Sequence, residues 1–162
     1  MQESIINRLK RTISALMGIF FSVISTSAQS QNQDCIEWRF AVKKTSVNTF
    51  NIHVTALINP PWHIYEKLLN IQESSLLSIT YEYNDNTILS DDLHVVGVPI
   101  EQYDNAIKNV VRYYTVAVNF VQKVSLIVDE PLTLKGQVAY VIGDGISKVE
   151  TRIEKFKITL ND

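Results

Sequence analysis

The sequence predicts an all-β protein built as an antiparallel β-sandwich, and three observations lead there. Apolar residues recur at every second position over most of the chain beyond residue 35, which is the period of a strand with one buried face. Seven or eight such segments are separated by short runs of turn-forming residues, an arrangement typical of a sandwich. Helical periodicity is weak, and its best stretch, residues 103–111, contains two asparagines, which disfavour a helix.

The first predicted strands form a hairpin followed by a third strand. Apolar residues alternate over residues 36–42 and again over 50–58, and we interpret the polar stretch 43–48 between them as the turn. The third strand covers residues 77–83. It is followed by Asn-Asp-Asn at 84–86, whose side chains suit a turn.

The second half of the chain is expected to supply the remaining strands. They are residues 114–120, 132–134, 138–142 and 149–160. In the last of them the apolar positions change phase between Ile153 and Phe156. A change of phase by one residue predicts a β-bulge near Glu154 and Lys155.

The first thirty residues differ in composition from the rest and are expected to be removed. Arg8, Lys10 and Arg11 precede an apolar run of about 12 residues, and small residues follow it. A helix needs roughly 20 apolar residues to span a bilayer. We therefore interpret residues 1–28 as a cleaved signal peptide and residues 30–162 as one domain. The expectation is a periplasmic or secreted protein with no stable membrane insertion after cleavage.

Charge and cysteine content exclude several classes of function. The chain has 15 Lys and Arg against 17 Asp and Glu, a net charge of −2, so no nucleic-acid partner is expected. A single cysteine excludes a structural zinc cluster, an iron–sulfur site and an intramolecular disulfide.

The sequence contains no enzyme motif that we can assign. No serine lies in a nucleophile elbow, and no glycine loop of the phosphate-binding kind is present. His53, His63 and His94 lack the close spacing of metal ligands, and we interpret His53 and His94 as solvated side chains. We expect no catalytic residue, no metal and no cofactor. This favours a protein that is not an enzyme, and a part in a protein-disulfide reductase system is the alternative.

Cys35, the only cysteine, allows three interpretations. It is a reactive thiol, a partner in an intermolecular disulfide, or an incidental residue at the start of the first strand. Redox exchange within one chain needs a second thiol to resolve the mixed disulfide, and the sequence has none.

Two segments are more distinctive than the rest. Residues 59–65, Asn-Pro-Pro-Trp-His-Ile-Tyr, put prolines directly after a strand, where they end its ladder, and then present Trp62 and Tyr65. Residues 136–145 form a strand through Tyr140 that runs into a tight Gly-Asp-Gly turn. The aromatic residues either cap the end of the core or line a site.

Taken in this order, the segments resemble the N-terminal domain of the thiol:disulfide interchange protein DsbD. The resemblance covers about residues 36–160 and also uses Trp38, the Tyr103-Asp104 pair and the strand ending at Phe120 to Val124. It implies an immunoglobulin-like β-sandwich in the periplasm. In that family the domain receives electrons from a membrane-embedded domain and passes them to thioredoxin-like proteins, so the implied partners are a thioredoxin-like periplasmic protein or a membrane redox partner.

The sequence departs from the family at the positions of its working cysteines. Family members carry this pair in the turn after the strand matched by Tyr140, at the positions of Gly143 and of Ser147 or Lys148. Both thiols are absent here. Because disulfide exchange proceeds by attack of a thiolate on sulfur, the family reaction is not expected at this turn.

Three functions remain as hypotheses. The first is a redox-inactive protein-binding module, for which the resemblance implies a partner surface of Trp62, Tyr65, Tyr103 and Tyr140. The second is a part in thiol–disulfide exchange, in a protein-disulfide reductase system, through Cys35 or a partner's thiols. The third is a purely structural sandwich in a surface assembly, which an exposed edge strand that polymerises the domain would favour.

Overall fold

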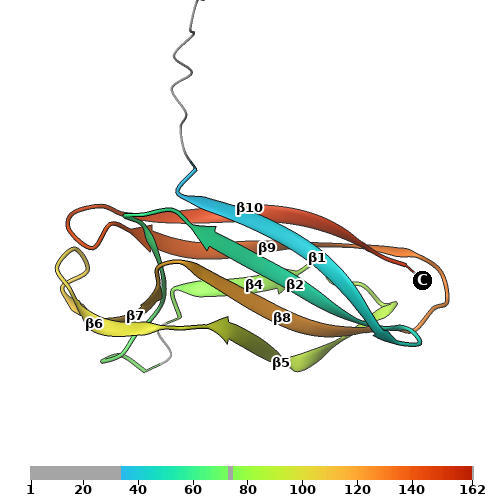
Figure 1. Cartoon of the computed structure of the whole chain (residues 1–162). Helices are drawn as coiled ribbons and strands as arrows, with labels where there is room; N and C mark the ends of the chain where they lie inside the picture. Colours follow the sequence, from blue (N-terminus) through green and yellow to red (C-terminus); the bar gives the residue numbers. More distant parts are fainter. Residues whose placement is uncertain (1–33, 73–74, 162) are drawn as a thin grey trace, which may run out of the picture. The chain divides into compact units, whose positions relative to one another are not determined.

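In the computed structural model, residues 34–72 and 75–161 are described, and they form ten β-strands (Figure 1). The strands are β1 (Ile36–Ser46), β2 (Thr49–Ile58), β3 (His63–Leu68), β4 (Leu77–Tyr81), β5 (Thr87–Gly97), β6 (Ile100–Asp104), β7 (Asn109–Tyr114), β8 (Ala117–Leu126), β9 (Leu132–Gly143) and β10 (Val149–Leu160). The predicted signal peptide, residues 1–28, lies outside the described residues. Within the part described, no helix could cross a membrane.

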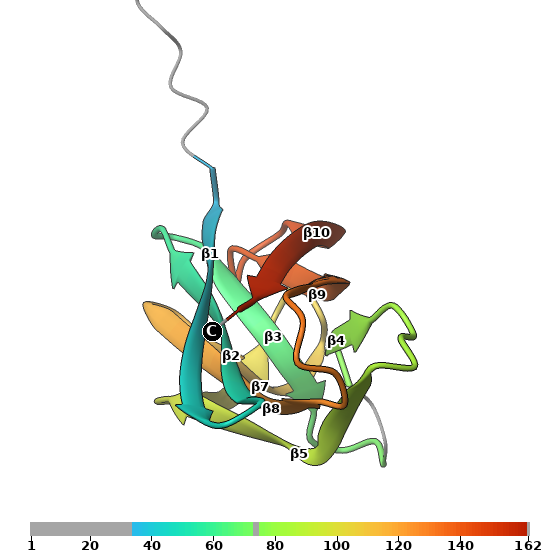
Figure 2. The ribbon, with the colours of Figure 1, turned by 90° about the vertical axis from the view of Figure 1, so that its right-hand side faces the viewer.

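The strands form two antiparallel sheets. One sheet has the order β1-β2-β8-β5, and the other has the order β10-β9-β3-β7-β6, with β4 added on β9. The two sheets face each other, and the view in Figure 2 separates β1 and β2 from β9 and β10. This arrangement confirms the predicted all-β antiparallel β-sandwich of immunoglobulin-like type.

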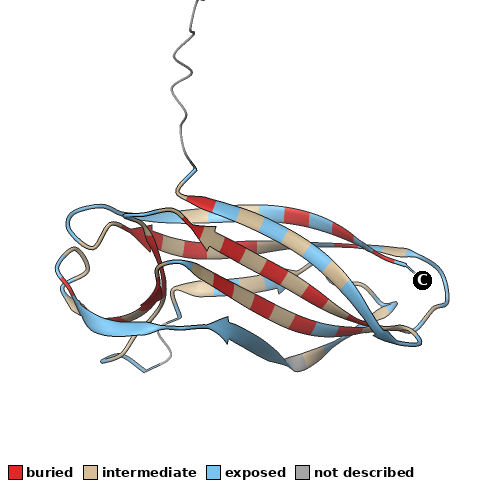
Figure 3. Ribbon diagram, in the orientation of Figure 1, coloured by how far each residue is buried: buried red, intermediate tan, exposed pale blue. Residues whose placement is uncertain are grey.

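Alternating burial along the central strands creates the core between the sheets. In β2 the residues at even positions are buried while those between them are partly exposed, and β8 repeats the pattern. Figure 3 shows the alternation as stripes along both strands. The largest side chains buried by these strands are Phe50, Ile52 and Phe120. Removing such apolar area from water is the main force that holds the sheets together.

Aromatic rings tie the first and last strands across the sandwich. Phe40 of β1 stacks on Phe156 of β10, with ring centroids 4.6 Å apart. Tyr81 of β4 meets the edge of the same Phe156 ring at 5.8 Å. Trp38 of β1 packs edge-on against Tyr140 of β9 at 5.1 Å. Phe156 therefore joins three strands from both sheets.

Several predicted elements have different boundaries in the structure. Residues 114–120 belong to two strands, because the chain leaves β7 at Tyr114 and enters β8 in the other sheet at Ala117. The predicted segments 132–134 and 138–142 are one strand, β9, which Gly136 continues without interruption.

The predicted β-bulge near Glu154 and Lys155 is wrong. The pairing of β10 with β9 continues in register through both residues. Ile153 simply points away from the core and is 58% exposed, whereas Phe156 points into it. The change of phase in the sequence therefore reflects an apolar residue on the outer face rather than an extra residue in the strand.

Four strands, β3, β5, β6 and β7, were not expected from the sequence, apart from Tyr114 at the end of β7. β3 begins just after Trp62, which follows the two prolines. β6 ends and β7 begins within the stretch with the best helical pattern, and β5 lies between predicted strands. β5 shows no alternation because its described residues from Asp92 to Gly97 are exposed on both faces. Since period-two patterning reports one buried face, an edge strand of this kind leaves no such signal.

Candidate functional site

The distinctive segments meet at one end of the second sheet, on the left in Figure 1. His63, the first residue of β3, pairs with Gly143, the last residue of β9. On its other side β3 pairs with β7, where Tyr65 lies opposite Tyr113. β6 pairs with β7 and ends at Asp104. Strand pairing thus brings residues from four parts of the chain together.

A buried cluster lies at this end and consists of His63, Tyr65, Asp104 and Tyr113; we call it the end cluster. All four residues are buried, and Tyr65 is completely so. The Tyr65 hydroxyl donates a hydrogen bond of 2.7 Å to Asp104 Oδ2. The His63 ring lies 4.6 Å from the Tyr113 ring and meets the Tyr65 ring edge-on at 5.3 Å.

The Asp104 carboxylate is well supplied with hydrogen-bond donors. Its Oδ1 accepts bonds of 2.8 Å from the backbone N–H groups of Ala106 and Ile107, in the turn between β6 and β7. Its Oδ2 accepts the Tyr65 hydroxyl. A buried carboxylate is tolerated only with such partners. Burial, reinforced by Asp104, raises the pKa of Tyr65, so its phenol stays protonated and serves as a donor.

His63 is the incompletely bonded member of the end cluster. Its Nε2 lies 3.8 Å from Asp104 Oδ2, beyond hydrogen-bond range, and has no hydrogen-bond partner although it is buried. Burial lowers the pKa of His63, and this effect outweighs the attraction of Asp104 and Asp144 for the charged form. The imidazole is therefore neutral at neutral pH.

The turn between β9 and β10 closes over the end cluster. Asp144 Oδ1 accepts bonds of 2.9 Å from the N–H groups of Ile146, Ser147 and Lys148, and these bonds lower the pKa of Asp144 to about 2. Gly145 follows with a φ of 73°, a left-handed conformation that glycine adopts without strain. A Cβ on Gly145 would lie 3.0 Å from His63 Cε1, so this glycine covers the imidazole ring directly.

The two positions that the resemblance assigns to the family cysteines are occupied by other contacts. A Cβ on Gly143 would lie 2.5 Å from the Tyr65 hydroxyl and 2.8 Å from the backbone oxygen of Lys148. Such a distance is shorter than van der Waals contact, so a cysteine at 143 requires Tyr65 to move. Lys148 places its Nζ 5.9 Å from the centroid of the Trp62 ring, a cation–π contact.

The four aromatic residues expected to bind a partner lie in different environments. Trp62 is half-buried and directly precedes His63, and Tyr103 is 57% exposed and directly precedes Asp104. Tyr103 lies on β6 and not in a loop. Tyr65 and Tyr140 are buried, Tyr65 in the end cluster and Tyr140 against Trp38. Of these four residues, only Trp62 and Tyr103 therefore present an aromatic ring to solvent.

The turn adds exposed residues that the sequence did not single out. Ile146 is 77% exposed, Lys148 is exposed beside Trp62, and Pro61 is exposed before it. We use the name end surface for the group of Trp62, Tyr103, Ile146 and Lys148. Within this group Lys148 contacts Trp62, and Trp62 and Tyr103 each directly precede a residue of the end cluster.

The single thiol lies beside the segment that leads to the end surface. Cys35 directly precedes β1, is partly exposed and packs at the margin of the main core. Its backbone oxygen accepts a hydrogen bond of 3.0 Å from the N–H of Asn59, three residues before Trp62. The thiol is therefore near this end of the sandwich without being part of the end cluster.

The three histidines divide into two kinds. His94 is exposed on β5, and His53 is partly exposed on β2, where its Nδ1 lies 3.1 Å from the Asn119 side-chain nitrogen. His63 was given no role from the sequence. Its position between Trp62 and Tyr65, at the start of a segment marked by prolines, was the available signal.

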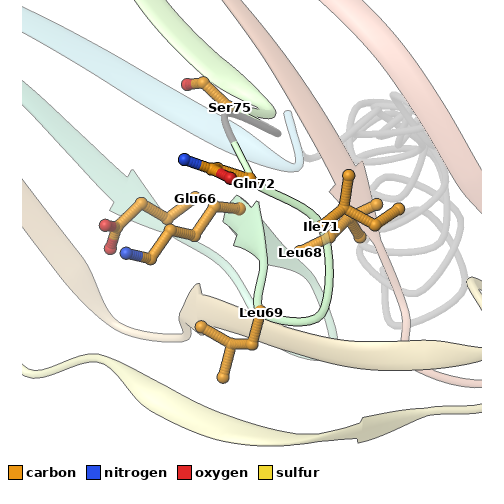
Figure 4. Close-up of a pocket in the computed structure, with 7 residues that line it drawn as sticks. Glu66, Leu68, Leu69, Ile71, Gln72 and Ser75 are labelled. Carbon is orange, nitrogen blue, oxygen red and sulfur yellow. The ribbon is translucent and has the colours of Figure 1, made fainter.

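The described residues do not assemble a metal centre, and a pocket in the structure lies away from the end cluster. No group of three His, Cys, Asp or Glu side chains within them could hold a metal ion. A cavity of about 550 Å³ is lined by residues around the end of β3, where Figure 4 shows Leu68 and Ile71 close together. Its carboxylate, Glu66, already accepts a 2.6 Å bond from the Tyr114 hydroxyl. The Ser75 hydroxyl at this pocket donates a hydrogen bond to the backbone oxygen of Leu77.

The fold and this end define a class of protein: an immunoglobulin-like β-sandwich domain whose last hairpin turn closes over a buried cluster that is separate from the main core between the sheets. Comparison with solved structures places the fold more closely. The N-terminal periplasmic domain of ScsB from Proteus mirabilis is similar, with a TM-score of 0.54 and 14% identity over 81% of this chain and 48% of that one. The reduced DsbD N-terminal domain of Neisseria meningitidis also has a TM-score of 0.54, with 13% identity over 79% of this chain and 87% of that one.

The chain thus has the fold of the DsbD N-terminal domain, as the motifs in its sequence suggested. It spans about half the length of the ScsB domain that it matches. No protein-family model matches the sequence, and neither does the sequence of any curated protein. At these identities the similarity establishes the fold, and the function has to be argued from the residues at the end of the sandwich.

Proposed function

We propose that this chain is an exported protein-binding domain of the DsbD N-terminal type that carries no redox centre at its last turn. Its partner is a thioredoxin-like periplasmic protein, which docks on the end surface. The proposal is supported by the fold shared with the DsbD and ScsB domains, together with the half-buried Trp62 and the exposed Tyr103 near the turn to which the resemblance assigns the family cysteines.

One observation supports the proposal that this turn has no redox role. The Tyr65 hydroxyl occupies the space into which a side chain at Gly143 would extend, and it is held there by its bond to Asp104. The site therefore lacks the first cysteine and is also packed in a way that has no room for it. Since thiol–disulfide exchange needs a thiolate, docking is the part of the family's behaviour that these residues support.

The end surface has the properties of a binding site for a protein. Aromatic side chains supply large contact areas and lose little conformational entropy on binding. The turn that carries Ile146 and Lys148 is held by three hydrogen bonds to Asp144. Its backbone therefore loses little conformational entropy when a partner binds. Trp62 is further held by the Lys148 contact.

The proposal includes the location of the domain. We infer that residues 1–28 direct export and that residues 30–162 work in the periplasm or outside the cell. The ScsB domain with the same fold is periplasmic. A periplasmic location also brings the domain together with the thioredoxin-like proteins that we propose as partners.

The test is a calorimetric titration of the purified protein with a purified thioredoxin-like periplasmic oxidoreductase, in its reduced and oxidised forms. Trp62→Ala and Tyr103→Ala are each expected to weaken binding about tenfold or more, as loss of an interfacial aromatic residue does. Tyr83→Ala is the matched control, because Tyr83 is exposed near the start of β9, away from the turn. Unchanged affinity in both end-surface variants, with the fold intact, would contradict the proposal.

A second candidate is thiol exchange through Cys35, favoured by its partial exposure beside the segment leading to Trp62. In this reaction the Cys35 thiolate attacks a partner disulfide, which forms a mixed disulfide and releases one partner thiolate. The same titration separates the two candidates. Docking alone leaves binding unchanged in Cys35→Ser, whereas exchange gives a covalent complex with wild type that a reductant releases and Cys35→Ser does not form.

A further inference from the structure

The edge of the first sheet at β5 differs from the other sheet edges. Residues 93–98, Leu-His-Val-Val-Gly-Val, carry no lysine, arginine or carboxylate, and all six are exposed. Val95 is 39% and Val96 is 51% exposed, on opposite faces of the strand. No strand in the described part of the chain pairs with the outer side of β5, which is the last strand in the order β1-β2-β8-β5. Figure 3 shows most of this strand as exposed.

The remaining edges carry the features by which β-proteins prevent pairing with other chains. β1 carries Glu37 and Arg39, which form an ion pair, and Lys43 and Lys44 further along. β10 has charged residues on both of its faces. β4 has only five residues, and its exposed positions are serine and threonine. β6 also has five residues and carries Glu101, which forms an ion pair with Arg112 of β7. Among the described edges, β5 therefore has the longest uncharged apolar stretch.

A structural irregularity limits how much of β5 is available. The pairing of β5 with β8 shifts register between Leu89 and Leu93, and it is regular from Leu93 to Gly97. The usable edge is therefore this second half of the strand. Its free backbone groups can be satisfied by another extended strand, and its uncharged side chains fit a strand that is itself uncharged.

We propose that β5 is a self-association edge, through which two copies of this chain pair antiparallel about a two-fold axis at Val95. In this register Val95 faces Val95 of the second copy, His94 faces Val96, and Leu93 faces Gly97. Leu93, Val95 and Gly97 lie on the inner face, because they pair with Gln122, Phe120 and Val118 of β8. Apolar residues thus face apolar residues or glycine on the inner face.

Charge in the paired register also favours a second copy as the occupant. Asp92 is the nearest described carboxylate, and it faces Val98 of the other chain instead of a second carboxylate. Like charges directly opposite each other destabilise a pair of strands. This register places none opposite each other. A partner strand bearing charged residues would have to bring them against an uncharged apolar edge.

The geometry of the pairing limits the association to two copies. Two copies of the four-stranded sheet join into one sheet with β5 at its centre and a β1 strand at each end. The new edges are the charged β1 strands, which disfavour further addition. Because a two-fold contact uses the same surface on both copies, it closes and does not propagate. The contact is short, so we expect a weak dimer, with a Kd of about 10–100 µM.

The test is sedimentation velocity on protein expressed from the full coding sequence, over about 1–500 µM, a range that spans the expected Kd. Wild type is expected to shift from monomer to dimer. Val95→Lys and Val95→Glu, each alone, are expected to stay monomeric, because the axis places two like charges opposite each other. An equimolar mixture of the two variants is expected to dimerise again, because lysine then faces glutamate.

Ile153→Lys is the matched control, since it places a lysine at an exposed apolar position on the β10 edge and should dimerise like wild type. Circular dichroism verifies that every variant is folded. A wild-type protein that stays monomeric over the whole range would overturn the proposal and leave an extended segment of another protein as the occupant. Failure of the mixture to dimerise would overturn the register centred on Val95. The end-surface variants leave this assay unchanged, so the two proposals fail independently.

Discussion

His63 contacts the other three members of the end cluster and the turn that covers it. Its ring lies beneath Gly145, between Tyr65 and Tyr113, and its Nε2 faces the carboxylate of Asp104 at 3.8 Å without a hydrogen bond. Protonation adds a charge to a buried ring. Asp104 and Asp144 attract that charge, but their effect does not offset the cost of burying it.

The position of His63 predicts that the protein loses stability in mild acid. Burial lowers the pKa of His63 in the folded state below its ordinary value of 6.5, which the unfolded chain retains. Below about pH 6.5 the unfolded chain therefore binds the proton more readily, so the free energy of unfolding falls as the pH decreases. The contribution of neutral His63 to the free energy of unfolding is fully present above about pH 6.5. It decreases as the pH falls from there toward the pKa of His63 in the folded protein.

Urea unfolding at pH 7.5 and pH 5.5 measures this effect. Wild type is expected to unfold at lower urea concentration at pH 5.5, and His63→Gln should lose most of that difference. His94→Gln, which changes an exposed histidine on β5, should keep it. A difference of the same size in His63→Gln as in wild type would show that other groups are responsible.

At the scale of elements, the turn between β9 and β10 contacts both the buried end cluster and a residue of the end surface. Asp144 holds it through three backbone N–H groups, Gly145 covers His63, and Lys148 contacts Trp62. The turn favours glycine at 145 because of the left-handed φ and because a Cβ there would lie only 3.0 Å from the imidazole.

Gly145→Ala is expected to reduce the free energy of unfolding by about 1–3 kcal/mol, from left-handed strain and the contact with His63. Thermal or urea unfolding measures the loss. Ser147→Ala, an exposed change in the same turn, should stay within about 0.5 kcal/mol of wild type. Equal stability of Gly145→Ala and wild type would mean that the turn does not press on His63.

Elements differ in how visible they are in the sequence. β1, β2 and β9 were predicted because each alternates between core and solvent, and this local pattern needs no knowledge of neighbours. β5 and β6 were missed because exposed residues occupy nearly all their described positions, so nothing in their own composition separates inner from outer face. Their pairing with β8 and β7 is what makes them strands.

At the scale of the whole molecule, stability depends on contacts between the two sheets. Phe156 of β10 stacks on Phe40 of β1 and also meets Tyr81 of β4. A domain of this size is stabilised by about 5–15 kcal/mol in total. The loss of one ring that joins three strands therefore removes a large share of the free energy of unfolding.

Phe156→Ala is expected to cost about 3–5 kcal/mol, the usual range for a buried phenylalanine. Urea unfolding followed by tryptophan fluorescence measures it, since Trp38 packs in the same region. Ile153→Ala on the same strand is largely exposed and should cost well under 1 kcal/mol. A similar small cost for both variants would show that the sheets do not depend on this ring.

The local pattern of the sequence was enough to determine the sandwich, the single thiol, and the glycine and lysine at the family's cysteine positions. Alternating polarity and residue identity are properties of the chain itself. Trp62 and Tyr103 could likewise be selected as candidates from their motifs, and both are at least partly exposed.

Only the tertiary structure decided which of these residues act together. His63, Tyr65, Asp104 and Tyr113 form one buried cluster because β3 lies between β7 and β9, and those pairings join residues far apart in the sequence. The same long-range contacts bury Tyr65 and Tyr140 and leave the edge of β5 uncovered. Burial and strand register depend on the neighbours that a segment acquires in the fold, and a segment's own periodicity does not contain that information.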